Sequence, residues 1–144
     1  MAFYLDTSAA VKLVVSERGS SALRTWARRH EGRVVSCDLL RTELLRTTRR
    51  GALQQMERAR AVLEAVTLLT VPTETFERAA LLDPPNLRSL DAIHLAAALS
   101  LGDDLEGFVT CDERQATSAR ATWRTAPWIQ RLSVELSGIE LLIS

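Results

Sequence analysis

The stretch FYLDTSAAVKLVV, residues 3–15, decides the fold class of this 144-residue chain. It begins with three apolar residues and passes through Asp6, Thr7 and Ser8 into a helical pattern that runs from Ala9 to Val15. A short buried strand followed directly by a helix is the unit from which parallel sheets are built, because parallel strands need a crossover connection between them. The stretch therefore predicts the first strand and helix of an α/β fold.

The same order of strand and helix returns along the chain. Strands are predicted at 33–37, 67–71 and 107–111, and helices at 20–30, 38–51, 52–65, 73–82, 90–101 and from 112 onward. Ser20 or Ser21 is expected to cap the second helix and Asp38 the third, while Ser89 precedes the helix at 90–101. This alternation favours a three-layer α/β/α fold, with a central, mostly parallel sheet covered by helices on both faces.

The length and composition indicate one globular domain over residues 1–144. Apolar residues make up 47% and charged residues 25% of the chain, as in ordinary soluble proteins. No apolar run approaches the roughly 20 residues of a membrane span, and the N-terminus does not resemble a signal peptide. Cys37 and Cys111 form no CxxC pair, so we interpret both as buried apolar residues in a reduced compartment. These features lead us to expect a cytoplasmic protein without a membrane partner.

Charge is unevenly distributed although the net charge is zero. Ten arginines and four acidic residues lie between Arg24 and Arg60, whereas two arginines and nine acidic residues lie between Ala61 and Asp112. A basic half that contacts phosphates and an acidic half that holds cations would fit this pattern. Two solvated helical faces would fit it as well.

Four acidic residues stand where chemistry is expected in such a fold. Asp6 and Asp112 each follow a predicted strand, and ligands of open α/β sheets bind beyond the carboxyl ends of strands. Asp91 lies in the first turn of an alanine-rich helix, and Glu43 lies inside the helix that follows the second strand. The four residues are therefore candidates for one shared site.

Each of these residues also has a structural interpretation. Asp6 can cap the first helix, Asp112 can form a capping box with Gln115, and Asp91 can favour the helix dipole. Glu43 can be a solvated helix residue. Taken together, clustered carboxylates repel one another unless a cation is present, and hard oxygen ligands suit Mg²⁺ or Mn²⁺. Such a metal can activate water for attack on a phosphodiester.

Four segments of the chain carry a family resemblance. They are Leu5–Ala9, Glu43 with Arg46, the run LDAIHLAAA at 90–98, and the run VTCDER at 109–114. Together they resemble the motifs of the PIN domain, and within it the VapC-type ribonuclease toxins of bacterial toxin–antitoxin pairs. The resemblance covers Phe3 to about Arg120, and the combination of the first and third segments is its most specific part.

The resemblance implies a function as well as a fold. It implies an acidic quartet, made of Asp6, Glu43, Asp91 and Asp112, that holds one or two Mg²⁺ or Mn²⁺ ions for the cleavage of RNA. Ser8 and Thr110 match small polar positions that orient the acids or a water. The family usually forms homodimers and is silenced by a small antitoxin protein. The segment 121–144 departs from the family pattern, although Gly138–Ile143 can form a last strand.

Several other residues have two interpretations. His94 follows Asp91 on nearly the same helical face, and a buried histidine is favoured over a metal ligand or a base. Arg46, Arg49 and Arg50 can contact RNA phosphates or remain solvated. Trp26 is expected in the core or in an oligomer contact. Packing or a partner interface is favoured over base stacking for Trp123 and Trp128.

Two other classes of function compete with the nuclease. A different Mg²⁺-dependent phosphate enzyme or a phosphoacceptor module would also place an aspartate after the first strand. The former would want a second aspartate at the position of Ser8, and the latter a late lysine, whereas Lys12 is the only lysine. The third class is a non-catalytic interaction module whose acids bind a partner's arginines. The presence of all four acids argues against it.

Overall fold

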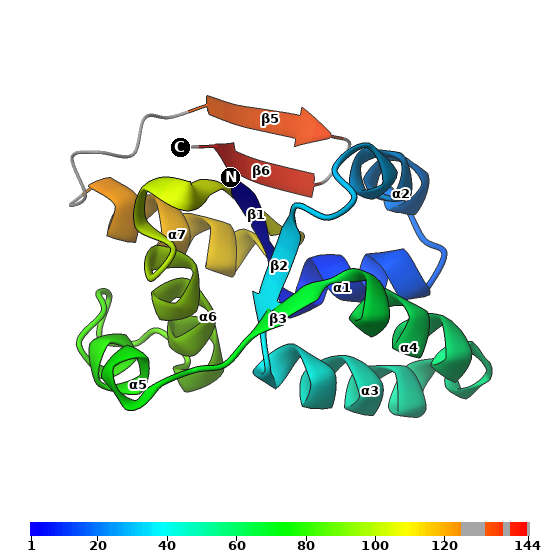
Figure 1. The fold of residues 1–144 in the computed structure, drawn as a ribbon, viewed down its shortest axis with the longest axis horizontal. Helices are drawn as coiled ribbons and strands as arrows, with labels where there is room; N and C mark the ends of the chain where they lie inside the picture. The colour runs from blue at the N-terminus through cyan, green and yellow to red at the C-terminus, as the bar shows by residue number, and fades with distance from the viewer. Residues whose placement is uncertain (125–131, 137–138, 144) are drawn as a thin grey trace.

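The computed structural model describes residues 1–124, 132–136 and 139–143 of the chain, and the strands in these residues form one six-stranded sheet (Figure 1). The strands are β1 (Ala2–Leu5), β2 (Val34–Cys37), β3 (Thr67–Leu69), β4 (Leu105–Thr110), β5 (Leu132–Leu136) and β6 (Ile139–Ile143). The helices are α1 (Thr7–Val14), α2 (Ser20–Arg29), α3 (Leu39–Gly51), α4 (Met56–Ala65), α5 (Thr73–Ala80), α6 (Ser89–Leu99) and α7 (Glu113–Arg124). Short 3₁₀ turns span Leu53–Gln55 and Gly102–Asp104.

The sheet is mostly parallel, as the sequence predicts. Its strand order is β3-β2-β1-β4-β6-β5, and the first four strands are parallel to one another. β6 pairs with β4 in the antiparallel direction, and β5 pairs with β6 in the same way. The predicted last strand is thus confirmed over Ile139–Ile143, whereas β5 was not predicted.

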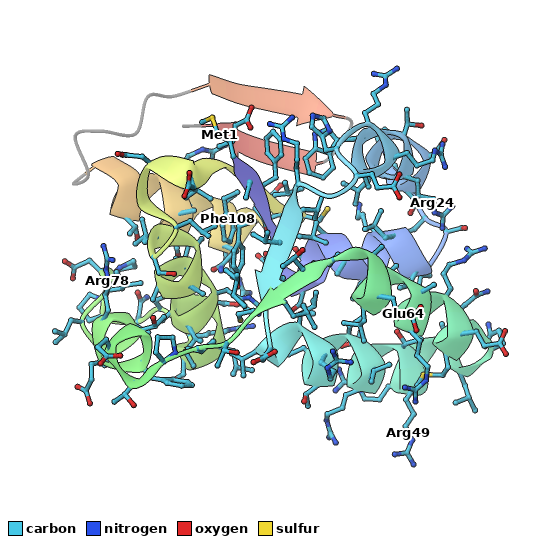
Figure 2. The ribbon with its side chains drawn as sticks, in the orientation of Figure 1. Met1, Arg24, Arg49, Glu64, Arg78 and Phe108 are labelled. Atoms are coloured by element: carbon cyan, nitrogen blue, oxygen red, sulfur yellow. The ribbon has the colours of Figure 1, made fainter. Side chains whose placement is uncertain are left out.

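Helices cover both faces of the sheet, which confirms the three-layer α/β/α architecture. Figure 1 shows α5, α6 and α7 on one side of the strands and α1 to α4 on the other. Side chains of β1 alternate between these layers, so that Phe3 and Leu5 pack in the core of α1 to α4 while Tyr4 packs with Phe108 and α6. Figure 2 shows Phe108 inside the molecule, and Arg49 and Arg78 projecting from its outer helices.

The order of the strands determines where a ligand can bind. From β1 the chain moves outward through β2 to β3, and it then returns to place β4 on the other side of β1. Connections from β1 and β4 therefore leave the sheet toward opposite faces, and in doubly wound sheets a crevice opens beyond the carboxyl ends of such strands. Asp6 follows β1 and Asp112 follows β4, so both predicted residues lie at this switch point.

Two predicted helix caps are wrong. The residue before α2 is Gly19, with a positive φ of 88°, and the hydroxyl of Ser20 instead donates to Val15 O and accepts from Glu17 N. Asp38 precedes α3 but has helical angles, φ −55° and ψ −26°, and its side chain makes no capping bond. An N-cap side chain reaches the free N–H groups of the first turn from an extended residue, which explains why Asp38 does not.

Several boundaries differ from the predicted ones by a few residues. The predicted helix 52–65 begins only at Met56, after a 3₁₀ turn, and β3 ends at Leu69 rather than at residue 71. No helix within the described ranges is long and apolar enough to cross a membrane. The prediction for Trp128 lies outside the described residues, as do the side chain of Trp123 and Gly138.

Candidate active site

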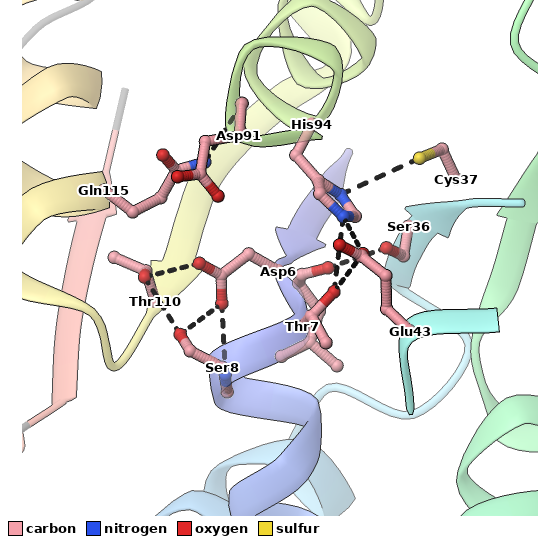
Figure 3. A network of polar contacts seen from close by, with 12 residues as sticks. Asp6, Thr7, Ser8, Ser36, Cys37, Glu43, Asp91, His94, Thr110 and Gln115 are labelled. Atoms are coloured by element: carbon pink, nitrogen blue, oxygen red, sulfur yellow. Dashed lines mark hydrogen bonds and ion pairs between the residues drawn. The ribbon is translucent and has the colours of Figure 1, made fainter. Parts of the chain in front are cut away.

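Asp6 is the centre of the candidate site and is 4% exposed. One carboxylate oxygen accepts hydrogen bonds from Ser8 Oγ at 2.7 Å and Ala9 N at 3.0 Å, and the other accepts from Thr110 Oγ1 at 2.5 Å (Figure 3). The bond from Ala9 makes Asp6 the N-cap of α1, so the structural interpretation is confirmed. Burial raises the pKa of Asp6 above its usual value, and the bonds from Thr110, Ser8 and Ala9 oppose that rise.

Ser8 and Thr110 join the end of β4 to the start of α1. Their hydroxyl oxygens lie 3.2 Å apart, and each also bonds Asp6. The backbone N–H of Cys111 donates to Ser8 Oγ, and that of Asp112 donates to Thr110 Oγ1. The two small polar residues that the sequence singles out therefore orient the Asp6 carboxylate and the backbone that leads to Asp112.

Asp112 caps α7, since its Oδ1 accepts from Arg114 N at 2.8 Å and from Gln115 N at 3.4 Å. The reciprocal half of the proposed capping box is wrong, because the Gln115 amide donates to the backbone oxygen of Asp91 instead. Burial raises the pKa of Asp91, and the charge of Asp112 raises it further. The two aspartates thus share one electrostatic environment at the N-terminal ends of α6 and α7.

Gln115 has a role in this region that the sequence did not predict. Its side chain is 1% exposed, and its Oε1 has no hydrogen-bond partner among the residues that the structure describes. Figure 3 shows the Gln115 amide beside Asp91. A buried carbonyl oxygen without a partner is costly, and a donor such as a water would satisfy it. Gln115 therefore marks a polar position beside Asp91 that is open to a ligand.

Glu43 projects from α3 toward His94 of α6 rather than standing free. Its Oε2 lies 2.6 Å from His94 Nε2 and accepts a 2.5 Å hydrogen bond from Thr7 Oγ1. The interpretation of Glu43 as a solvated helix residue is wrong, since its side chain is only 21% exposed. Burial tends to raise the pKa of Glu43, but the contacts with His94 and Thr7 outweigh burial and lower it.

His94 is 2% exposed, so the prediction of a buried histidine is confirmed. Its Nδ1 lies 2.8 Å from the hydroxyl of Tyr4 and 3.7 Å from Cys37 Sγ. Burial tends to lower the pKa of His94, but the interactions with Cys37 and Glu43 prevail and raise it to about 10. Cys37 is buried as expected; burial tends to raise the pKa of its thiol, but the contact with His94 outweighs burial and lowers it.

The four predicted acids do not form a ready-made metal cage. Within residues 1–124, 132–136 and 139–143, no three His, Cys, Asp or Glu side chains are grouped closely enough to hold an ion by themselves. Mg²⁺ is usually held by only one or two carboxylates, with waters and substrate phosphate completing its shell. Hard oxygen donors, raised pKa values at Asp6 and Asp91 and the free Oε1 of Gln115 fit such a cation.

The remaining candidates divide between surface and core. Arg46, Arg49 and Arg50 are exposed on α3. Trp26 is 7% exposed and packs edge-on against Phe3, which confirms its place in the core. The sequence did not reveal the contacts of Tyr4 and Thr7, although Thr7 adjoins Asp6.

A doubly wound sheet with carboxylates at its switch point is the arrangement of an α/β enzyme or ligand-binding protein, because ligands bind at that point. Comparison with protein families identifies the family within this class. The PIN domain family model matches residues 3–121, and the chain belongs to this family.

Three relatives from Mycobacterium tuberculosis resemble the chain over most of its length. Ribonuclease VapC47 (strain CDC 1551 / Oshkosh) is 40% identical over 121 residues, which cover 81% of this chain and 89% of that protein. Ribonuclease VapC46 (strain ATCC 25618 / H37Rv) is 41% identical over 119 residues, 83% of this chain and 91% of the relative. Ribonuclease VapC35 is 37% identical over 121 residues, 82% and 90% respectively. The resemblance inferred from the sequence motifs is confirmed.

Proposed function

We propose that the chain is a Mg²⁺- or Mn²⁺-dependent endoribonuclease that acts as the toxin of a toxin–antitoxin pair. The observation that carries this proposal is the buried Asp6 carboxylate, which three donors hold at the switch point of the sheet. Burial makes the charged form of this carboxylate unfavourable unless a cation lies nearby. The relatives at 37–41% identity are named as ribonucleases, which supports RNA as the substrate.

In this proposal Asp6 and Asp91 are the principal metal ligands, with Asp112 and Glu43 completing the acidic quartet. The bound metal would lower the pKa of a water and neutralise charge that develops on the phosphodiester. Thr110 and Ser8 hold the Asp6 carboxylate in one orientation, which spares the site the cost of ordering it during reaction. Gln115 offers its free Oε1 to a water beside Asp91.

The partners follow from the same proposal. RNA is the substrate, and the exposed Arg46, Arg49 and Arg50 on α3 offer positive charge to its phosphates. A cognate antitoxin protein would silence the enzyme in the cytoplasm, and the chain would act as a homodimer. Other Mg²⁺-dependent phosphate-ester hydrolysis and a non-catalytic interaction role are the outcomes that the following test distinguishes.

The test uses the full chain, purified free of any antitoxin, with a broad pool of cellular RNA. Cleavage is expected with added Mg²⁺ or Mn²⁺ and none with EDTA, because the carboxylates alone activate no water. A pool that stays intact with either metal contradicts the proposal. Cleavage of small phosphate monoesters in place of RNA would assign the chain to the other class of hydrolase.

A further inference from the structure

Glu43 has two donors on the same oxygen atom. His94 Nε2 and Thr7 Oγ1 both reach Oε2, at 2.6 Å and 2.5 Å. Within residues 1–124, the hydrogen bonds of Glu43 all end on Oε2, so Oε1 is the oxygen that remains for a ligand. The carboxylate is thereby fixed in rotation, with one oxygen held by the protein.

The ring nitrogen of His94 that does not face Glu43 is also held by a hydrogen bond. The hydroxyl of Tyr4 lies 2.8 Å from Nδ1, and the two rings meet edge to face with centroids 5.9 Å apart. Tyr4 is fully buried on β1 and stacks on Phe108, so this support is part of the rigid sheet. Three elements, β1, α6 and α3, are thus connected in the order Tyr4, His94, Glu43. Figure 3 shows the contact between His94 and Glu43.

We propose that His94 is a positioning residue, which fixes the Glu43 carboxylate so that Oε1 faces the metal and substrate, and that Tyr4 sets the orientation of the His94 ring. This inference rests on the proposed function, since it takes Glu43 as part of the acidic quartet. Groups that hydrogen-bond a metal-binding side chain orient that side chain and tune its basicity. Their loss typically lowers metal affinity or activity by about 10–100-fold.

The arrangement works in either protonation state of the ring. Nε2 carries a proton both in the imidazolium and in the neutral tautomer that donates to Glu43. Tyr4 adapts to both, because its hydroxyl can donate to a bare Nδ1 or accept from a protonated one. The inference therefore depends on the position of the ring between its two partners.

His30 provides a matched control, since the chain contains two histidines. It ends α2, where its Nδ1 bonds the backbone oxygen of Trp26 at 2.7 Å and its ring packs against Phe3. None of these contacts involves the acidic residues. A substitution of His30 therefore measures the general effect of losing a partly buried histidine.

The first experiment measures Mn²⁺ binding by calorimetry without RNA. His94→Asn is expected to weaken binding by about 10–100-fold, since its short amide does not reach Glu43. His94→Gln, whose longer amide can place an N–H near Glu43, is expected to restore most of the affinity, and His30→Gln should bind as the unmodified protein does. Equal losses in His94→Asn and His94→Gln, or native affinity in His94→Asn, overturn the inference.

A second measurement needs no variant of His94 that might misfold. Nitrogen-15 NMR of the unmodified, metal-free protein should show a proton on His94 Nε2 that exchanges slowly with water, and Glu43→Gln should shift this signal. An unprotonated Nε2, or a signal that Glu43→Gln leaves in place, overturns the inference.

The two measurements also distinguish a failure of this inference from a failure of the proposed function on which it rests. An unmodified chain that binds Mn²⁺ but cleaves no RNA contradicts the ribonuclease while the affinities of the His94 variants still decide the inference. A chain that cleaves RNA, with His94→Asn as active and as tightly Mn²⁺-binding as the original, overturns the positioning role alone. An unmodified chain that binds no Mn²⁺ overturns both.

Discussion

The hydroxyl of Thr110 donates a 2.5 Å hydrogen bond to the carboxylate of Asp6, although 104 residues separate the two in the sequence. The contact exists because β1 and β4 are parallel neighbours whose carboxyl ends meet at one edge of the sheet. The same hydroxyl accepts from the backbone N–H of Asp112. One threonine thus connects the first and the last of the four predicted acids.

Thr110→Val should destabilise the protein by about 1–3 kcal/mol, because it leaves the buried Asp6 carboxylate without one donor. The shape of the side chain is nearly kept, and valine suits a strand. Denaturant unfolding at neutral pH measures the change. Thr117→Val is the control, since Thr117 is exposed on α7 and bonds only the preceding turn. Equal stabilities of the two variants would refute the role given to Thr110.

Asp6→Asn should abolish RNA cleavage and yet leave the metal-free protein as stable as the original or more stable. Burial raises the pKa of Asp6 above 3.8, so across the window from 3.8 to the raised value the folded chain keeps a proton that the unfolded chain has lost. The free energy of unfolding therefore falls as pH rises through this window. Denaturant curves between about pH 4 and about pH 7 should show a flatter dependence in the variant. A steeper one would be inconsistent with a strained carboxylate.

Mn²⁺ should raise the melting temperature of the unmodified protein. A ligand that binds only the folded state stabilises it by about 2.7 kcal/mol when its free concentration is about 100 times Kd. Asp6→Asn and Asp91→Asn should lose most of this gain, because each removes metal charge. Asp38→Asn is the matched control, since Asp38 is exposed and its side chain makes no capping bond. Similar gains in all four proteins, seen by calorimetry, would remove Asp6 and Asp91 as ligands.

The contacts of His94 with Cys37 and Glu43 should make stability depend on pH on the alkaline side. The pKa of His94 rises from 6.5 to about 10 on folding, so the stability it contributes is fully present below 6.5 and is lost as pH rises through about 10. His94→Gln removes the titrating group and should flatten the unfolding free energy over that range, whereas His30→Gln should keep the original slope. Denaturant titrations of all three proteins at several pH values measure these slopes. An unchanged slope in His94→Gln would contradict the assignment of the pH dependence to His94.

The fold could largely be predicted from the sequence because its signals are local. The run from Phe3 to Val15 shows a strand and a helix by periodicity alone, and β2, β3 and β4 follow in the same way. Caps were less predictable, since Ser20 and Asp38 have the right side chains for the role. Whether such a residue caps depends on its backbone angles, which its neighbours in space help to set. β5 was missed although its sequence LSVEL alternates apolar and polar residues, because the segment 121–144 around it departs from the family pattern.

The sequence predicted which residues form the candidate site better than it predicted the contacts between them. Asp6 and Asp112 follow strands, so topology alone brings them to one edge of the sheet. The partner of Glu43 could not be inferred, because Glu43 and His94 lie 51 positions apart in the sequence and meet only through the way α3 and α6 pack. The spacing of Asp112 and Gln115 predicts a capping box, and only the position of α6 shows why the Gln115 amide turns to Asp91 instead.

Carboxylates at the switch point are proposed to hold the metal on which RNA cleavage depends. The most direct measurement is the initial rate of RNA cleavage at saturating Mn²⁺ by Asp91→Asn, set against the unmodified protein and Asp38→Asn at equal folded concentration. Asp38→Asn is expected to cleave at the original rate, whereas Asp91→Asn should show no cleavage above the level seen with EDTA. Original rates in Asp91→Asn, or cleavage by the unmodified protein that persists in EDTA, would contradict the proposed metal site.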